Sequence, residues 1–114
     1  MKALVLEAYN KLVYKDVPDP VINSDEVLVQ VKACGICGSD VHGLDGSTGR
    51  RIPPLIMGHE ASGVIVKTGN DVKIWNAGDR VTFDSTVFRV DDWFTRRGLY
   101  NISDNREVIG VSPG

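Results

Sequence analysis

The sequence predicts a mainly β domain made of short strands, with no more than a turn or two of helix. Apolar and polar residues alternate with the two-residue period of a strand, most clearly at Val27, Val29 and Val31. The 12 glycines exceed the average usage of about 7% and indicate many turns. The chain has 114 residues, 42% of them hydrophobic, which suits one globular domain. We therefore expect residues 1–114 to form a single domain.

Five strands are expected, at residues 2–7, 11–16, 26–33, 63–68 and 80–83. Residues 17–24 are a connection because Pro18 and Pro20 cannot donate ladder hydrogen bonds. Turn signals at residues 69–71 (GND) and 77–79 (AGD) bound the segment between the last two strands. The alternation in strand 26–33 predicts that one of its faces is buried.

Residues 35–57 are predicted to form a loop, because they are rich in glycine and close with Pro53 and Pro54. Only residues 39–44 could form a helical turn or two. From Asp84 onward the sequence becomes polar, and we expect an irregular lobe at about residues 84–107. Loops carry binding and catalytic residues more often than cores do, so the long loop is the place to look for function.

The charge balance excludes some classes of partner. With 13 Lys and Arg against 15 Asp and Glu, the net charge is −2, which gives no electrostatic case for nucleic acid or an anionic membrane. No apolar run approaches the roughly 20 residues that cross a bilayer. The N-terminal segment reaches Glu7 too soon for a signal peptide. We expect a cytoplasmic protein in which Cys34 and Cys37 are thiols available for metal or redox chemistry.

The chemistry-bearing residues gather in two short segments, 34–42 and 58–60. Their thiol, imidazole and carboxylate groups are the ligand types that bind Zn²⁺. The pair Cys34 and Cys37 alone could also be a dithiol redox centre or two buried apolar thiols. A redox centre needs a helix that begins at Cys37, and the glycines that follow favour at most a brief turn.

Several separated motifs resemble the medium-chain alcohol dehydrogenase family, and together they run through essentially the whole chain. Residues 58–63 (GHEASG), followed by Gly69 and Val72, resemble its zinc signature. Residues 35–42 (GICGSDVH) are similar to its polyol branch, which contains sorbitol, threonine and galactitol-phosphate dehydrogenases. Residues 78–81 (GDRV) resemble its strand-entry turn. The resemblance implies a GroES-like, partly open β-barrel that serves as the catalytic domain.

The resemblance also implies roles for individual residues. Cys37 and His59 would be ligands of a catalytic Zn²⁺, and Glu60 an inner-shell or water-bridged ligand. Zinc would polarise a small alcohol or polyol, Ser39 and His42 would relay its proton to solvent, and hydride would pass to the nicotinamide of NAD(P).

Other residues near these ligands receive structural interpretations or none. Cys34 matches no ligand, so we interpret it as a packed small thiol. Gly58 and Gly63 are expected to be structural, through close backbone approach or unusual dihedral angles. Asp40 receives no role.

Two departures from the family pattern concern the completeness of the site. No Gly-x-Gly-x-x-Gly occurs, so we expect the Rossmann domain that holds NAD(P) to be absent. The family's third protein ligand to zinc lies beyond Gly114, which predicts weak or incomplete metal binding. We expect this chain to be inactive alone, with NAD(P) bound only in a longer form, and interpret it as an engineered or naturally shortened piece.

A third departure concerns the structural zinc lobe that many members carry. Its spacing of four cysteines falls here on Arg89, Asp92, Thr95 and Ser103. None is a thiol, so we expect no structural zinc. The sequence predicts that apolar side chains pack in its place, namely those of Trp93, Phe94, Leu99 and Ile102.

Two other functions stay open at this level. The chain could be a non-catalytic β-barrel or engineered scaffold whose zinc loop is vestigial, or a dithiol redox protein. Strands that the family adds to the barrel lie outside this sequence, which predicts an unpaired edge and pairing into a homo-oligomer.

Overall fold

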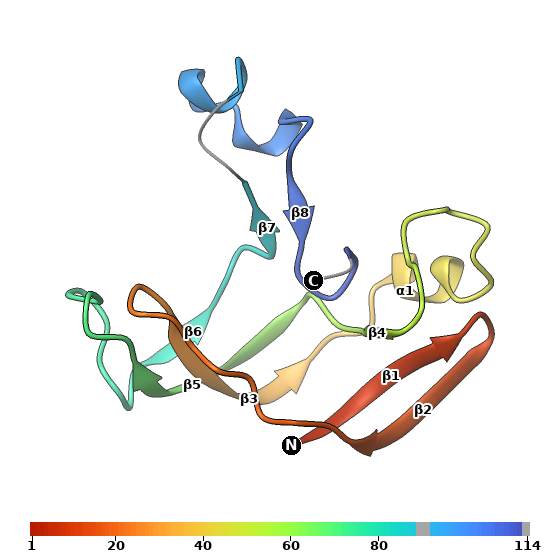
Figure 1. Cartoon of the computed structure of the whole chain (residues 1–114), viewed down its shortest axis with the longest axis horizontal. Coiled ribbons are helices and arrows are strands. Elements are labelled where there is room, and N and C mark those ends of the chain that lie inside the picture. Colours follow the sequence, from red (N-terminus) through yellow and green to blue (C-terminus); the bar gives the residue numbers. More distant parts are fainter. Residues whose placement is uncertain (89–91, 113–114) are drawn as a thin grey trace.

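The computed structural model describes residues 1–88 and 92–112, and its body consists of two three-stranded antiparallel sheets (Figure 1). In the first sheet, β1 (Lys2–Ala8) lies between β2 (Lys11–Asp16) and β4 (Leu55–Ile56). The hairpin turn between β1 and β2 contains Asn10 at φ +60, a conformation that asparagine tolerates better than most residues. The N–H of Asn10 donates to the Leu44 carbonyl at 2.8 Å, which ties this turn to the long loop.

In the second sheet, β5 (Ala61–Thr68) lies between β3 (Val27–Cys34) and β6 (Arg80–Thr82). The expected burial of one face of β3 is wrong at its far end, where Val31 is 54% exposed. The pairing of β3 with β5 shifts register twice, and one shift follows Val31 directly. These irregularities interrupt the ladder, and the alternation seen in the sequence does not produce one buried stripe.

The core is small and draws mainly on β1, β4 and β5. Its buried apolar members are Ala3, Val5, Leu6, Leu55, Ala61 and Ile65. The Cα radius of gyration is 15.3 Å, against roughly 13 Å for a compact domain of this length. The prediction of a mainly β, partly open architecture is confirmed.

The segment between the sheets carries a short helix, α1 (Gly38–Gly43), one residue ahead of the predicted helical turn at 39–44. The loop from α1 returns to β4, which pairs with β1. β4 was not expected, because residues 35–57 were predicted to be loop. Two residues are too few to show the apolar and polar alternation of a strand, so β4 is recognised only by its pairing with β1.

The lobe stands away from the two sheets (Figure 1). Its base is a short antiparallel pair, β7 (Thr86–Val87) with β8 (Glu107–Val108), and it contains two 3₁₀ turns, η1 (Thr95–Arg97) and η2 (Tyr100–Ile102). It is therefore more regular than the sequence predicted, since its two ends pair. Arg89 lies outside the described residues.

After β8 the chain returns to the body and meets the loop that precedes β5. Gly110 has φ +75, and a Cβ there would lie only 1.9 Å from the Gly58 carbonyl oxygen. Only glycine allows so close an approach of the two backbones.

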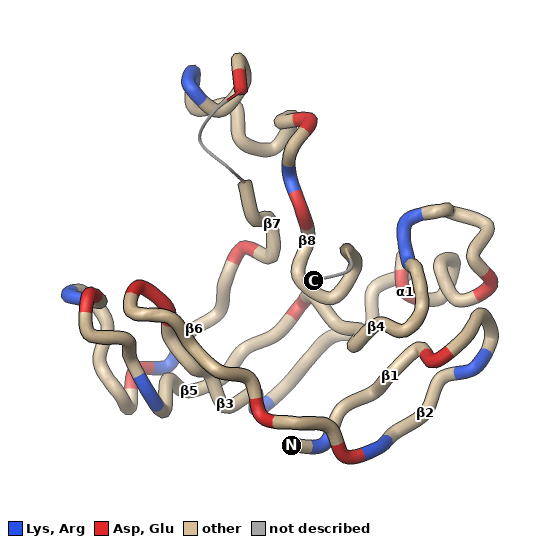
Figure 2. Tube along the Cα trace, in the orientation of Figure 1, with Lys and Arg blue, Asp and Glu red and all other residues tan. Residues whose placement is uncertain are grey.

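Acidic and basic residues are interspersed over the sheets, the loops and the lobe (Figure 2). This distribution agrees with the balanced net charge. Within the described ranges, helices are too short and too polar to cross a membrane.

Candidate metal centre

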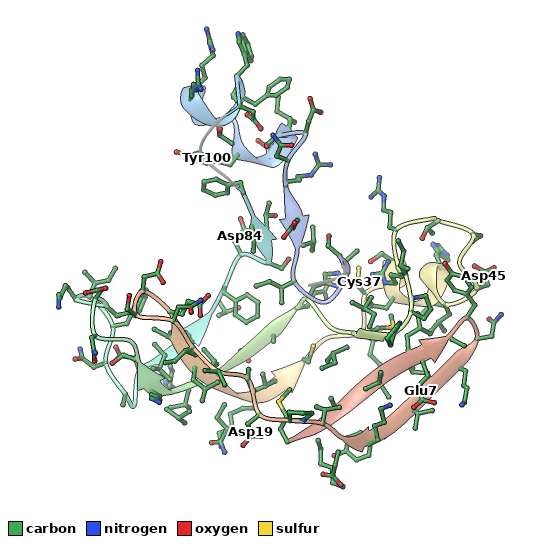
Figure 3. All side chains as sticks on the ribbon, viewed as in Figure 1. Glu7, Asp19, Cys37, Asp45, Asp84 and Tyr100 are labelled. Carbon is green, nitrogen blue, oxygen red and sulfur yellow. The ribbon has the colours of Figure 1, made fainter. Side chains whose placement is uncertain are left out.

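Cys37, His59 and Glu60 converge on one point of the structure. Cys37 is the N-cap residue of α1, and its label in Figure 3 lies beside the start of that helix. His59 and Glu60 lie in the turn before β5. One ligand atom from each residue lies within 4.8 Å of the others, with Cys37 and His59 half-buried and Glu60 exposed. The three predicted ligands therefore come together, although they arise from two segments about twenty residues apart in the chain.

Asp40 connects the two segments that carry these groups. Its Oδ2 accepts a hydrogen bond from the Cys37 N–H at 3.0 Å. Its Oδ1 lies 3.4 Å from His59 Nδ1. Asp40 is buried, so this carboxylate is a fixed link between the backbone of one predicted ligand and the ring of another.

Arg51 lies on the far side of the same carboxylate. Its Nη2 donates to Asp40 Oδ1 at 2.8 Å and to Ser39 Oγ at 3.1 Å. Arg51 is 2% exposed, and this buried charge is paired, as buried charges need to be.

Sequence reasoning assigned no role to Asp40 and did not single out Arg51. A signal for Asp40 was present, because an acidic residue three positions after an N-cap commonly accepts from the cap N–H. A signal for Arg51 was its position at the start of the otherwise apolar run 52–56 (IPPLI).

Two buried nitrogen atoms lack a hydrogen-bond partner among the residues that the structure describes. They are His59 Nδ1 and Arg51 Nε. The 3.4 Å approach of Asp40 Oδ1 to His59 Nδ1 is longer than the usual 2.7–3.2 Å range of an N–H···O bond. Unsatisfied buried polar atoms are rare in folded proteins and often mark sites that act on an ion or a ligand.

Ser39 and His42 open onto a cavity of about 490 Å³ that His59 also lines. Ser39 precedes Asp40 in α1 and His42 lies one turn later, so both side chains project from the helix that begins at Cys37. Val108 and Val111, on the return from the lobe, line the cavity as well. The structure thus brings the two predicted relay residues to the same space as one of the predicted ligands.

The interpretation of Cys34 as a packed thiol is wrong in one respect, since Cys34 is exposed. It ends β3, and its Sγ lies 3.6 Å from the Gly35 carbonyl oxygen. Cys34 is not part of the group of three ligand atoms around Cys37. A helix does begin after Cys37, but it spans only six residues, which agrees with the brief turn that the sequence predicts. Both thiols are free in the structure.

The two glycines of the 58–63 segment have the structural roles that the sequence predicts. Gly58 adopts φ +120, which L side chains rarely do. A Cβ on Gly63 would lie 2.3 Å from the Gln30 carbonyl oxygen. Gly63 therefore allows β5 to approach β3 closely just after the predicted ligands.

The comparison with known proteins decides the family. Residues 23–114 match the model of the alcohol dehydrogenase GroES-like domain. The chain belongs to this family. Human sorbitol dehydrogenase is 39% identical over 114 residues, and D-xylulose reductase from Morganella morganii is 40% identical over 106 residues. These alignments cover 97% and 90% of the chain but 32% and 31% of the two enzymes, so the chain spans about a third of their length.

Solved structures share the fold closely. A Sinorhizobium meliloti protein described as a zinc-binding dehydrogenase and solved with NADP has a TM-score of 0.91 at 34% identity, over 97% of this chain and 32% of that one. Galactitol-1-phosphate dehydrogenase from Escherichia coli has a TM-score of 0.89 at 27% identity, over 100% and 34%. The predictions of the family and of a GroES-like fold are confirmed.

The four-cysteine spacing of a structural zinc lobe falls on four positions of this lobe, and the structure describes three of them. Hydrogen bonds join these three residues. Ser103 Oγ donates to Asp92 Oδ2. The other carboxylate oxygen, Oδ1, accepts from the Thr95 N–H at 2.7 Å. Ser103 Oγ also accepts from the Asn105 N–H at 3.2 Å. Ser103 and Thr95 are buried. We call the set Asp92, Thr95 and Ser103 the lobe knot.

The hydrogen bonds of the lobe knot change the pKa of Asp92. Hydrogen bonds from the Ser103 hydroxyl and then the Thr95 N–H lower the pKa of Asp92, because they stabilise the ionised carboxylate. The expected packing of apolar side chains in place of the metal is seen only in part. Phe94 is half-buried and packs edge-on against the Trp93 ring at a centroid distance of 5.2 Å, whereas Trp93, Leu99 and Ile102 are each at least 40% exposed.

Proposed function

We propose that this chain is the zinc-binding catalytic domain of an NAD(P)-dependent alcohol or polyol dehydrogenase. The observation that carries the proposal is the convergence of Cys37, His59 and Glu60 within 4.8 Å beside the cavity that Ser39 and His42 line. Human sorbitol dehydrogenase and D-xylulose reductase are relatives whose names describe polyol chemistry. They support a secondary alcohol of a polyol as the substrate class.

The donor set suits Zn²⁺ by its chemistry. Thiolate, imidazole and carboxylate match the preferences of this cation. Because Asp40 faces His59 Nδ1, we assign Nε2 of the ring to the metal, in the arrangement in which a carboxylate orients a ligating histidine. Cys37 and His59 would hold the ion, with Glu60 as an inner-shell or water-bridged ligand, and this incomplete set predicts weak binding. Zn²⁺ held there would act as a Lewis acid on the alcohol oxygen.

Ser39 and His42 are proposed to carry the alcohol proton to solvent. Arg51 donates to Ser39 Oγ, so the Ser39 hydroxyl keeps one acceptor position and its own proton for groups in the cavity. In the proposed relay, Ser39 accepts the alcohol proton and passes its own to His42. His42 is exposed, so it can release the proton directly to solvent.

The nicotinamide that accepts the hydride is assigned to parts of the enzyme outside this domain. The relatives are about three times as long as the aligned region. For the same reason we propose that the 114-residue chain has no turnover by itself. We also propose that an unpaired sheet edge allows it to form a homo-oligomer.

Metal stoichiometry tests the proposed function. After reconstitution and equilibration with a fixed free concentration of Zn²⁺, the chain is expected to hold about one ion, because its predicted ligand atoms form a single group. Cys37→Ala and His59→Ala are expected to abolish retention, as measured by elemental analysis on folded protein.

Cys34→Ala is the matched control, since this thiol lies only three residues away but outside the group of ligand atoms. It should retain the ion. If the wild-type chain binds no Zn²⁺, or if Cys34→Ala loses it as fully as Cys37→Ala does, the proposal is wrong, and the non-catalytic scaffold becomes the better description.

A further inference from the structure

The side chain of Arg51 lies buried against α1, in the space left by the missing side chain of Gly43. It is the largest of the fully buried side chains, and its stem passes the last turn of α1 at Gly43. A Cβ on Gly43 would lie 2.6 Å from Arg51 Cδ and 2.8 Å from Nη1. Gly43 is itself buried. The glycine therefore allows the guanidinium to lie against the helix, where any larger residue would displace it.

Arg51 and His59 approach the same oxygen atom of Asp40. Asp40 Oδ1 is the atom that accepts from Arg51 Nη2 at 2.8 Å and also the atom that lies 3.4 Å from His59 Nδ1. The other oxygen, Oδ2, is held by the Cys37 N–H. The carboxylate is thus fixed at both ends, and Arg51 determines where the oxygen that faces His59 lies.

The second hydrogen bond of Nη2 fixes the guanidinium in turn. It runs to Ser39 Oγ at 3.1 Å, so one nitrogen is shared between two acceptors that are neighbours in α1. A planar guanidinium held in this way cannot rotate without losing one of them. A buried charge needs such partners, because its desolvation is otherwise unfavourable.

On the basis of the function proposed above, we propose that Arg51 is a positioning residue of the metal centre, which holds Asp40 Oδ1 against His59 so that the imidazole faces the cation. Arg51 itself touches neither the metal nor the substrate. Carboxylates that orient a ligating histidine change metal affinity by about 10- to 100-fold when they are lost. Arg51 acts one step further out, through that carboxylate.

The adjacent Arg50 provides a matched control. It also lines the cavity, but it is exposed. Arg50→Lys makes the same chemical change beside the same cavity. It leaves the hydrogen bond between Arg51 and Asp40 in place.

Binding of Co²⁺ alone, followed by visible absorption, tests the inference on the full chain. Arg51→Lys keeps the positive charge, so the buried Asp40 still has a cation nearby, but the stem is one bond shorter and a single ammonium cannot keep both contacts. We expect Arg51→Lys to weaken Co²⁺ binding by about 10-fold or more and to change the d–d absorption, which reports ligand geometry. Arg50→Lys should bind within about twofold of wild type, as surface substitutions usually do.

A double-mutant cycle shows whether the effect passes through Asp40. Asp40→Asn should weaken Co²⁺ binding, and adding Arg51→Lys to it should cause little further loss, because the link is already broken. Gly43→Ala provides a second route, since it displaces the guanidinium while Arg51 stays in the sequence.

The outcomes separate the two proposals. If the wild-type chain binds no Co²⁺, the proposed function fails, and this inference fails with it. If wild type binds Co²⁺, and folded Arg51→Lys or Gly43→Ala shows the same affinity and spectrum, Arg51 is only structural and the inference alone is overturned. The same conclusion follows if the losses from Asp40→Asn and Arg51→Lys simply add.

Discussion

The metal centre and the lobe knot differ in how they use polar side chains. Around the predicted metal site, ligand groups stay available: the Cys37 thiol is free, and Asp40 Oδ1 faces His59 Nδ1 at 3.4 Å, which in the proposed function leaves Nε2 of the ring for a cation. In the lobe, Asp92, Thr95 and Ser103 satisfy one another. A site prepared for a cation is therefore recognised by the donors that folding leaves open, whereas a cluster of polar residues that bond to each other is already complete.

The two regions also differ in what holds them. A structural zinc contributes roughly 10–16 kcal/mol of apparent binding free energy in small zinc-finger peptides. A single hydrogen bond, even one to an ionised carboxylate such as that of Asp92, contributes far less than this. The lobe knot can maintain the local turn geometry of a zinc lobe, but it is a much weaker cross-link. The following substitutions test this comparison, beginning with the largest expected effect.

Arg51→Ala should be the most damaging single substitution. It leaves the buried Asp40 without its cation, and breaking a buried ion pair from one side costs about 3–5 kcal/mol. Urea unfolding followed by circular dichroism measures the loss. Arg50→Ala, next to it but exposed, should stay within about 0.5 kcal/mol of wild type. Equal effects of the two substitutions would mean that the buried pair around Asp40 does not support the fold.

Ser103→Ala should have a smaller effect that is concentrated in the lobe. It removes the donor to Asp92 and the acceptor of the Asn105 N–H, and the loss of a neutral hydrogen bond such as the latter costs about 0.5–1.5 kcal/mol. Amide hydrogen exchange should show faster exchange in η1 and η2 and little change in β5. Ser62→Ala, at an exposed position of β5, is the control. Accelerated exchange throughout the sheets would contradict a local role for the lobe knot.

Acid should weaken the lobe through Asp92. Because the pKa of Asp92 is lowered in the folded chain, its contribution to stability is complete above the unfolded value of about 3.9 and is lost as pH falls through the folded value. Protection of the Thr95 amide should therefore be constant from neutral pH to about pH 4 and decline below it.

Substitution at two neighbouring acidic positions isolates this effect. Asp92→Asn should lower protection of Thr95 at neutral pH and flatten its decline in acid. Asp104→Asn, at an exposed residue of the same lobe, should leave both unchanged. A decline that persists in Asp92→Asn would assign the acid sensitivity to another group.

Local sequence signals predicted the longer strands and missed the shortest ones. β1, β2, β3, β5 and β6 were predicted within two residues at each end, because they have their own period and turn signals. β4, β7 and β8 have two residues each. Such pairs exist only because a partner strand passes by, and no local pattern can indicate that.

Short motifs indicated the predicted ligands, whereas the residues that contact them were not singled out. Cys37, His59 and Glu60 lie in segments whose composition is distinctive. The link from Arg51 to Asp40 depends on a guanidinium that folds back over Gly43, eight residues earlier in the chain. Buried pairs of this kind are decided by tertiary packing, which the sequence pattern does not reveal.

The pairing of β7 with β8 holds the two ends of the lobe together. Thr86 pairs with Val108 at its base, and just beyond it Gly110 packs on Gly58, so both ends of the excursion are fixed before the chain re-enters the site. The free energy of closing such a loop rises by only about 0.6 kcal/mol for each doubling of its length. The tip of the lobe is therefore the natural point at which to graft another module onto this chain, such as a metal-binding hairpin or a peptide tag, while the cavity wall at Val108 and Val111 stays in place.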